Sequence, residues 1–400
     1  HVAARIAALE GGVGAMLTSS GQAANFFALF NICEAGSHIV ASSSIYGGTF
    51  NLISVTLAKM GVKSTFISPD CTEEELNAAF TPETRAVFGE TIANPALTVL
   101  DIEKFAKVAH AHGVPLIVDN TFPTPVNCRP IEWGANIVVE SATKWINGHG
   151  TAMGGVIVDA GTYKWDNGKF PEIAGPSAGY HGLNMYEAFG NQAFIVKCRV
   201  DGLRDLGCCP SSFDSYLMAL GLETLSLRAA HAVESTRRLA LWLNEHPLVE
   251  KVSYVGLPDN PSHENAKKYF RHGGGAVLAV QLKGTLDTTV KVVESVQLFQ
   301  HMTMIGDSVS VITHPASTTH KQLSDEELLK PDGDQPKPEL GMFERMGLEK
   351  QAQTGKDASV LDFLPVVGGV RQAAQNRQGA MEQKLFSGEY RDTLEASRYA

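Results

Sequence analysis

Apolar runs alternate with amphipathic stretches along residues 36–160, and this alternation constrains the fold more than any other feature. Strands are predicted at 38–41, 62–67, 85–90, 114–119, 135–140 and 153–158, and helices at 49–60, 72–80 and 101–112. The strands are apolar along nearly their whole length. Strands of this kind are buried on both faces and are joined through helices. The pattern therefore predicts an α/β fold with a mainly parallel sheet.

The chain has 400 residues, more than one small core usually holds, so at least two domains are expected. A smaller α/β unit is predicted after the first, with helices at 230–244 and 286–298 and strands at 249–255, 276–282 and 308–312. After Lys330 the composition turns polar, apart from an apolar patch at 360–367. We expect a large domain over 1–228, a small C-terminal domain over 229–330 and a divergent tail over 331–400.

Composition excludes several classes of protein. The formal net charge of −10 argues against a nucleic-acid partner, because a protein that binds nucleic acid normally has a basic face. No apolar run is long enough to cross a bilayer, so no membrane partner is expected. The six cysteines form no CxxC pair, so neither a metal site nor a disulfide framework is expected. Cys208 and Cys209 are predicted to be buried thiols of a reducing compartment, and no signal pattern precedes them, which favours a cytoplasmic protein.

One lysine stands out. Lys144 lies in the turn Ser141–Gly150, between two predicted buried strands. Burial lowers the pKa of a lysine and makes its neutral amine available for a Schiff base. An ordinary loop lysine beside a strand is the alternative interpretation, and this window alone does not decide between the two.

Small residues open the first long apolar helix. The run from Ser19 to Gln22 precedes a helical pattern that reaches Phe30. The exposed N–H groups at such a helix start can bind a phosphate. A plain N-cap by a serine is the alternative, and it is the commoner use of this pattern.

Further polar residues follow predicted strands, at the edge where α/β proteins bind ligands. Asp119 ends a buried strand and needs a partner, such as a protonated ring nitrogen, although it can also cap the loop. Tyr46 precedes two glycines and can stack on a flat ligand, or it can belong to the core. Asn94 stands before Pro95, which is also typical of a turn.

A single ligand explains these signals together. Pyridoxal 5'-phosphate has an aldehyde for Lys144, a ring nitrogen for Asp119, a flat face for Tyr46 and a phosphate for the helix start at 19–22. We therefore expect pyridoxal phosphate as the cofactor, and no metal.

Six motifs carry a family resemblance: Ser20–Ala23, Tyr46–Thr49, Glu90–Pro95, Val118–Thr121, Ser141–Lys144 and His314–His320. With them the chain resembles the Cys/Met-metabolism family of pyridoxal-phosphate enzymes, of aspartate-aminotransferase-like fold type I. Within the family it is most similar to the O-acetylhomoserine sulfhydrylases, because the long irregular segment 159–190 resembles an insertion of those enzymes. The resemblance covers residues 1–330.

The resemblance implies a role for each matching residue. Lys144 would bind the cofactor as a Schiff base and transfer protons, Asp119 would pair with the ring nitrogen, and Tyr46 would stack on the ring. Asn94 would lie near the phenolic oxygen and the substrate carboxylate, and Ser317 near the substrate.

The phosphate ligands implied by the resemblance come from two segments. They are the N–H groups of Gly21 and Gln22 and the hydroxyls of Ser141 and Thr143. The chain departs from the family pattern at both ends. The N-terminal portion with a Tyr-x-Arg pair is missing, and the C-terminal arginine that binds the substrate carboxylate is not found, Arg345 being its nearest counterpart.

The implied reaction is a γ-replacement. O-acetylhomoserine and sulfide, or a thiol, would give homocysteine, or methionine, and acetate. A cystathionine γ-synthase, a methionine γ-lyase-like enzyme, and a cofactor-binding member with impaired catalysis are the alternatives. The resemblance also implies a homotetramer built as a dimer of dimers.

Overall fold

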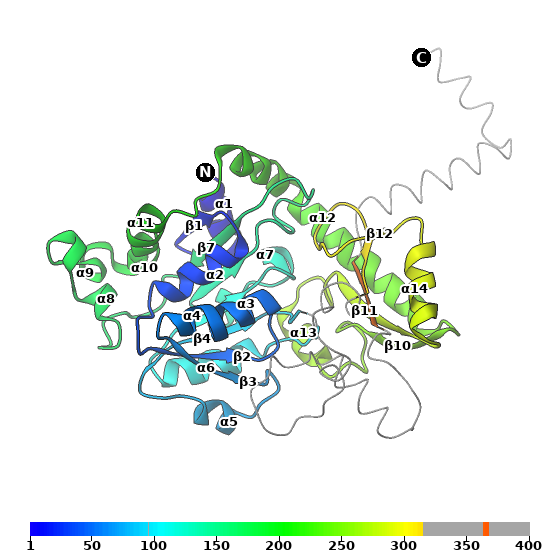
Figure 1. Ribbon diagram of the computed structural model, residues 1–400, viewed down its shortest axis with the longest axis horizontal. Helices are drawn as coiled ribbons and strands as arrows, with labels where there is room; N and C mark the ends of the chain where they lie inside the picture. The colour runs from blue at the N-terminus through cyan, green and yellow to red at the C-terminus, as the bar shows by residue number, and fades with distance from the viewer. Residues whose placement is uncertain (95, 315–362, 368–400) are drawn as a thin grey trace, which may run out of the picture.

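A seven-stranded sheet forms the centre of the computed structural model, which describes residues 1–94, 96–314 and 363–367 (Figure 1). The strand order is β1-β7-β6-β5-β4-β2-β3. The strands are β1 (Gly14–Thr18), β2 (His38–Ser42), β3 (Lys63–Ile67), β4 (Thr84–Glu90), β5 (Leu116–Asp119), β6 (Ile137–Glu140) and β7 (Gly155–Asp159). Strands β2 to β6 pair in parallel, whereas β7 is antiparallel to both of its neighbours. The predicted α/β fold with a mainly parallel sheet is confirmed.

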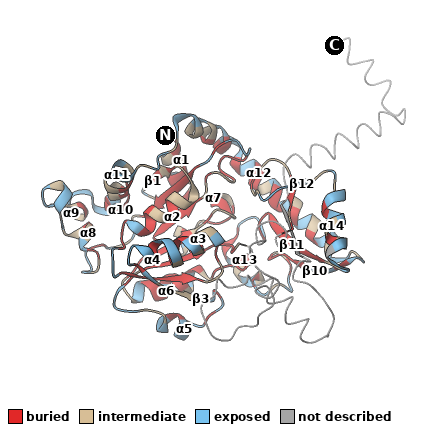
Figure 2. Ribbon diagram, viewed as in Figure 1, coloured by how far each residue is buried: buried red, intermediate tan, exposed pale blue. Residues whose placement is uncertain are grey.

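Each face of the sheet packs against its own layer of helices. On β4, Val87 belongs to the core shared with α1 (Val2–Glu10) and α6 (Ile102–Ala111). The next residue, Phe88, belongs to the core shared with α2 (Gly21–Phe30) and α10 (Ala193–Lys197). The buried strands lie between these layers of helices (Figure 2). Continuously apolar strands are therefore buried on both faces, as expected.

The remaining helices of the large unit are short. They are α3 (Gly47–Asn51), α4 (Leu57–Lys59), α5 (Glu73–Ala78), α7 (Thr124–Asn127), α8 (Pro171–Ala174), α9 (Met185–Phe189) and α11 (Arg204–Leu206). The helix predicted at 49–60 begins two residues earlier and contains a π-helical turn over Leu52–Thr56. Helix α6 ends before Gly113, whose φ of 64° lies in the left-handed region that glycine favours.

Helix α12 (Ser212–Asn244) is a single helix of 33 residues, which contains the helix predicted at 230–244 and begins well before it. It contains no proline, and Arg228 in its middle is buried and bonded within the protein. The helix contacts α7 of the large unit and β10 and β11 of the second sheet. The predicted domain boundary at residue 228 falls inside it, and the division of the chain at that point stays a prediction.

A second sheet has the strand order β10-β11-β14-β13-β12. Its strands are β10 (Val249–Ser253), β11 (Val277–Leu282), β12 (Gln300–His301), β13 (Val311–Ile312) and β14 (Phe363–Val367), and its helices are α13 (His263–Tyr269) and α14 (Leu286–Ser295). Strand β14 pairs antiparallel with both β11 and β13. It comes from the segment predicted as a divergent tail, so this apolar patch contributes an inner strand to the sheet.

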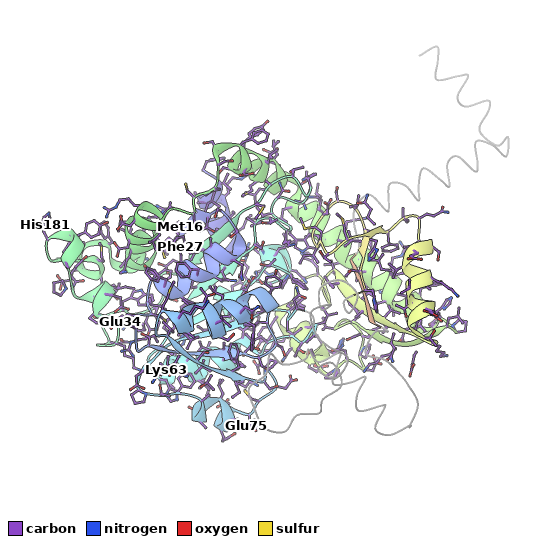
Figure 3. The ribbon with its side chains drawn as sticks, viewed as in Figure 1. Met16, Phe27, Glu34, Lys63, Glu75 and His181 are labelled. Atoms are coloured by element: carbon purple, nitrogen blue, oxygen red, sulfur yellow. The ribbon has the colours of Figure 1, made fainter. Side chains whose placement is uncertain are left out.

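The irregular segment 159–190 lies at one end of the large unit and includes the short β8 (Pro176–Ser177) and β9 (Leu183–Asn184). It is anchored by Trp165, which is buried and stacks on Phe194 at 5.3 Å between ring centroids. His181 lies at its outer tip, far from Met16 and Phe27 in the core (Figure 3).

The prediction of buried thiols at Cys208 and Cys209 is wrong. Both residues are exposed, whereas Cys33, Cys71 and Cys198 are buried. The pair lies in the short loop between α11 and α12, and such loops run over the surface of a protein. Within the described residues, no helix is both long and apolar enough to cross a membrane.

Candidate active site

The ends of three neighbouring parallel strands bring the predicted site together. Strands β4, β5 and β6 end at Glu90, Asp119 and Glu140, and Glu90 is paired in register with Asp119. The turn that holds Lys144 follows β6, and the loop that holds Tyr46 follows β2. Carboxyl ends of parallel strands meet at one edge of a sheet, where ligands of α/β proteins bind.

Lys144 is half-buried in a hydrogen-bonded turn. Its N–H donates to the carbonyl of Ser141 at 3.0 Å, and its carbonyl accepts from Gly148 at 2.7 Å. The side-chain nitrogen lies 3.2 Å from the sulfur of Met304. None of the ion pairs formed by the described residues includes Lys144, and burial lowers its pKa. The amine therefore loses its proton more readily than that of a surface lysine.

Asp119 is held by the loop that follows it. Its Oδ1 accepts the N–H of Thr121 at 3.0 Å and the hydroxyl of the same residue at 2.5 Å. Burial raises the pKa of Asp119, and the hydrogen bonds from Thr121 oppose that shift. The loop-capping interpretation is thus also correct, since the carboxylate does cap its loop. It leaves a half-buried carboxylate that no ion pair among the described residues neutralises.

Thr121 also links Asp119 to the lysine turn. Its hydroxyl oxygen accepts the N–H of Ser141 at 2.8 Å. A chain of two hydrogen bonds thus runs from the carboxylate at the end of β5 to the first residue after β6. Thr121 belongs to the motif Val118–Thr121, but the sequence alone predicted no role for this residue.

The start of α2 packs directly against Ser141. A Cβ added to Gly21 would lie 2.7 Å from the Cβ of Ser141, so only glycine allows this approach. Ser20 caps the helix, because its hydroxyl accepts the N–H of Ala23 at 3.1 Å. The N-cap interpretation is therefore correct as well. The two predicted phosphate segments, at Gly21 and at Ser141, are brought together.

Thr143 is the predicted phosphate ligand whose hydroxyl is already engaged. It donates to the carbonyl of Gly154 at 3.1 Å and accepts the N–H of the same residue at 3.0 Å. These bonds tie the lysine turn to the segment before β7.

Tyr46 and Gln22 meet over Gly48. A Cβ on Gly48 would lie 2.5 Å from the Tyr46 ring and 2.8 Å from Nε2 of Gln22. Tyr46 is 50% exposed, so the core interpretation of this tyrosine is wrong. Gln22 accepts hydrogen bonds from Asn25 and from the Thr49 hydroxyl, both at 3.2 Å. Its side chain is thereby fixed beside the ring of Tyr46.

Asn25 and Met304 are further site residues that the sequence did not single out. Asn25 is buried on α2, where its amide donates to Gln22 and Thr49, and its side chain lowers the pKa of the Asp119 carboxyl. The position of Asn25 one helical turn after Gly21 is the feature of the sequence that could have indicated its place in the site. Met304 reaches Lys144 from a segment 160 positions along the chain, so no local pattern could indicate it. Asn94 follows β4 and is half-buried; Pro95, Ser317 and Arg345 lie outside the described residues.

A mainly parallel α/β sheet with a half-buried lysine and a glycine-started helix at the carboxyl edge defines a cofactor-dependent enzyme. The model of the Cys/Met metabolism PLP-dependent enzyme family matches residues 1–335. The chain belongs to this family, which confirms both the resemblance and the expected cofactor.

Individual proteins agree with the family match. The chain is 48% identical over 324 residues to O-acetyl-L-homoserine sulfhydrylase 1 of Thermus thermophilus, covering 81% of this chain and 77% of that protein. It is 48% identical over 326 residues to homocysteine synthase of Schizosaccharomyces pombe, covering 81% and 76%. A crystal structure described as an O-acetylhomoserine (thiol)-lyase of Campylobacter jejuni, with N'-pyridoxyl-lysine-5'-monophosphate, superposes with a TM-score of 0.80 at 31% identity, covering 92% and 82%.

The residues present fit pyridoxal phosphate. The half-buried carboxylate of Asp119 suits a cationic ring nitrogen, and the amine of Lys144 suits an aldehyde. Gly21 leaves room at the helix start that a side chain would fill. Charge, reactivity and space thus match three separate parts of the same molecule.

Proposed function

We propose that this protein replaces the acetate of O-acetylhomoserine by sulfide or a thiol, forming homocysteine or methionine. The bond from Cγ to the ester oxygen breaks and acetate leaves with its electron pair, while the sulfur supplies the pair for the new bond to Cγ. The identity of 48% to a protein named as an O-acetyl-L-homoserine sulfhydrylase, over 81% of the chain, is the observation that carries this proposal. An amino-acid ester and sulfide are then its small-molecule partners.

Lys144 takes the central chemical role. Its amine, with a pKa lowered by burial, bonds to the cofactor at rest and, once released by the substrate, removes the proton from Cα. Pyridoxal phosphate, when bound, supplies an electron-accepting ring that stabilises the resulting negative charge. Met304, at 3.2 Å from the amine, limits the access of water to it.

The other predicted residues bind and orient. Asp119, positioned by Thr121, keeps the ring nitrogen protonated, and Tyr46 stacks on the ring. By the family resemblance, Asn94 would contact the phenolic oxygen and the substrate carboxylate, and Ser317 would serve substrate binding.

Four groups hold the phosphate. They are the N–H groups of Gly21 and Gln22 at the start of α2, and the hydroxyls of Ser141 and Thr143. The hydroxyl of Thr143 exchanges its bond to Gly154 for one to the phosphate. The contact between Gly21 and Ser141 supports this set, since it places both segments around one point.

We also propose that the protein is a cytoplasmic homotetramer, a dimer of dimers. All six cysteines are free thiols, which suits a reducing compartment. Exposed apolar residues on α12, among them Phe213, Tyr216 and Leu227, support an interface between copies.

Product analysis tests the proposal. The purified protein, loaded with pyridoxal phosphate, is given O-acetylhomoserine with sulfide, with methanethiol, or with cysteine. Homocysteine as the main product supports the proposed reaction, whereas cystathionine as the main product, or a keto acid without a nucleophile, assigns one of the two alternative reactions. Cofactor absorbance without any turnover identifies a family member with impaired catalysis. Lys144→Ala must abolish the covalent bond to the cofactor, while Lys164→Ala, at an exposed lysine, serves as the control.

A further inference from the structure

Glu90 ends β4 at the centre of the candidate site, yet none of the roles above uses it. Its side chain is 6% exposed. It is paired in register with Asp119 on the neighbouring strand. Two site loops depart close to it: the loop with Tyr46, which follows β2, and the segment with Asn94, which follows β4.

The carboxylate of Glu90 joins these two loops. Its Oε1 accepts the backbone N–H of Tyr46 at 2.7 Å, and its Oε2 accepts the backbone N–H of Asn94 at 3.1 Å. The two donors are 48 residues apart in the sequence, so the carboxylate is a bridge between separate parts of the chain. Both oxygens are thereby satisfied by hydrogen bonds.

We propose that Glu90 is a positioning residue, which fixes the backbone of Tyr46 and Asn94 relative to Asp119. Its effect on catalysis rests on the proposed function, because it acts through the side chains that contact the cofactor and the substrate. The bridge itself is a property of the protein without its cofactor. The bridge and its effect on catalysis can therefore be tested separately.

The chemistry of this position favours a carboxylate over any neutral side chain. Two N–H donors need two acceptor oxygens, and the side-chain amide of glutamine offers only one. Burial raises the pKa of Glu90, as does the nearby negative charge of Asp119, while the bonds from Tyr46 and Asn94 lower it. A buried acid beside another acid is costly, so a position with no task would be better filled by an apolar residue.

Hydrogen exchange tests the bridge directly. In the full-length protein without cofactor, Glu90→Gln is expected to speed exchange at the amides of Tyr46 and Asn94 by about tenfold or more, since a bond to a charged acceptor is lost. Glu172→Gln is the matched control. It makes the same change in a half-buried acid on α8, outside the site, whose carboxylate accepts neither of these N–H groups. Unchanged exchange at both amides in Glu90→Gln overturns the proposal.

A second measurement separates positioning from general stability. With pyridoxal phosphate bound, Glu90→Gln is expected to change the circular dichroism of the visible cofactor band and to raise KM more than it lowers kcat, while Glu172→Gln keeps both. A variant that only lowers the melting temperature, with an unchanged cofactor band, contradicts a positioning role. If Glu90→Gln does not fold, Glu90→Asp takes its place, because its shorter carboxylate cannot reach both donors. A wild-type protein that binds no cofactor refutes the proposed function, while the exchange data still decide on the bridge.

Discussion

The side-chain nitrogen of Lys144 lies 3.2 Å from the thioether sulfur of Met304, although 160 positions separate the two residues. The large unit supplies the lysine, and the segment before β13 supplies the methionine. A thioether accepts hydrogen bonds weakly and carries no charge. It therefore shields the amine from water without stabilising its protonated form, which agrees with the lowered pKa of Lys144.

Shortening this methionine should make Lys144 more like a surface lysine. In Met304→Ala, water reaches the amine, so its pKa rises toward the ordinary value and the pH at which it reacts with an aldehyde rises too. Labelling of Lys144 by pyridoxal phosphate and borohydride over a pH series, read by peptide mass, measures this midpoint. Met302→Ala, at an exposed residue of the same segment, should leave it unchanged. A midpoint that stays in place in Met304→Ala contradicts the shielding role.

The close approach of Gly21 to Ser141 should make Gly21 intolerant of any side chain. An alanine Cβ would meet the Ser141 Cβ at 2.7 Å, and the overpacking costs about 1–3 kcal/mol. Gly21→Ala should therefore lower the free energy of unfolding and weaken binding of pyridoxal phosphate. Denaturant unfolding and equilibrium dialysis measure the two effects. The control is Gly47→Ala, whose Cβ would have no neighbour within 4 Å, and wild-type behaviour is expected there.

Arg228 should stabilise the lysine turn. Its buried guanidinium donates to the carbonyls of Trp145 at 2.9 Å and Gly221 at 2.8 Å, so Arg228→Met leaves both carbonyls without this donor. We expect a loss of about 2–4 kcal/mol in unfolding free energy. Arg238→Met, at an exposed position of the same helix, should change stability by less than about 0.5 kcal/mol. Equal losses in the two variants, by denaturant titration, would speak against the role of Arg228.

Asp159 should make stability fall as the pH rises. Burial raises its pKa from 3.8 to about 7, so the folded protein keeps a proton that the unfolded chain releases between these values. The contribution of this proton is present below pH 3.8 and is lost as the pH rises to about 7. The variant Asp159→Asn lacks this titration. The free energy of unfolding of the variant, relative to that of the wild type, should therefore rise with pH by up to about 1.4 kcal/mol per pH unit in that window. A difference that does not vary with pH contradicts the assignment.

Local patterns were enough to predict the parallel centre of the large sheet. Strands β2, β4, β5 and β6 each contain a run of apolar residues, and α6 has an N-cap and a terminating glycine, which are properties of neighbouring residues. Strand β1 was not predicted, because its partner residues lie far along the chain: Gly14 pairs with Asp159. The inner position of β14 and the unbroken course of α12 likewise depend on packing between distant segments.

The residues of the candidate site also fall into those that a local pattern indicates and those that depend on contacts between distant segments. Lys144, Asp119 and Gly21 were predicted because each lies at the end of a strand, in the turn that follows a strand, or at the start of a helix, and that position is visible in a short window. Met304 was missed since its contact with Lys144 spans the chain. Glu90 belongs to the motif Glu90–Pro95, but its bridge depends on the position of the loop with Tyr46, which lies 44 residues upstream.

The antiparallel pairing of β1 with β7 has a consequence for the order of events during synthesis of the chain. Strand β1 leads straight into the start of α2, so the helix end at Gly21 cannot take its final place until β1 is docked. Its docking partner ends at Asp159, which emerges from the ribosome some 140 residues later. A nascent chain stopped before β7 should therefore have the carboxyl ends of the parallel strands in place, but the start of α2 should not yet be positioned. The site should then form in one late step.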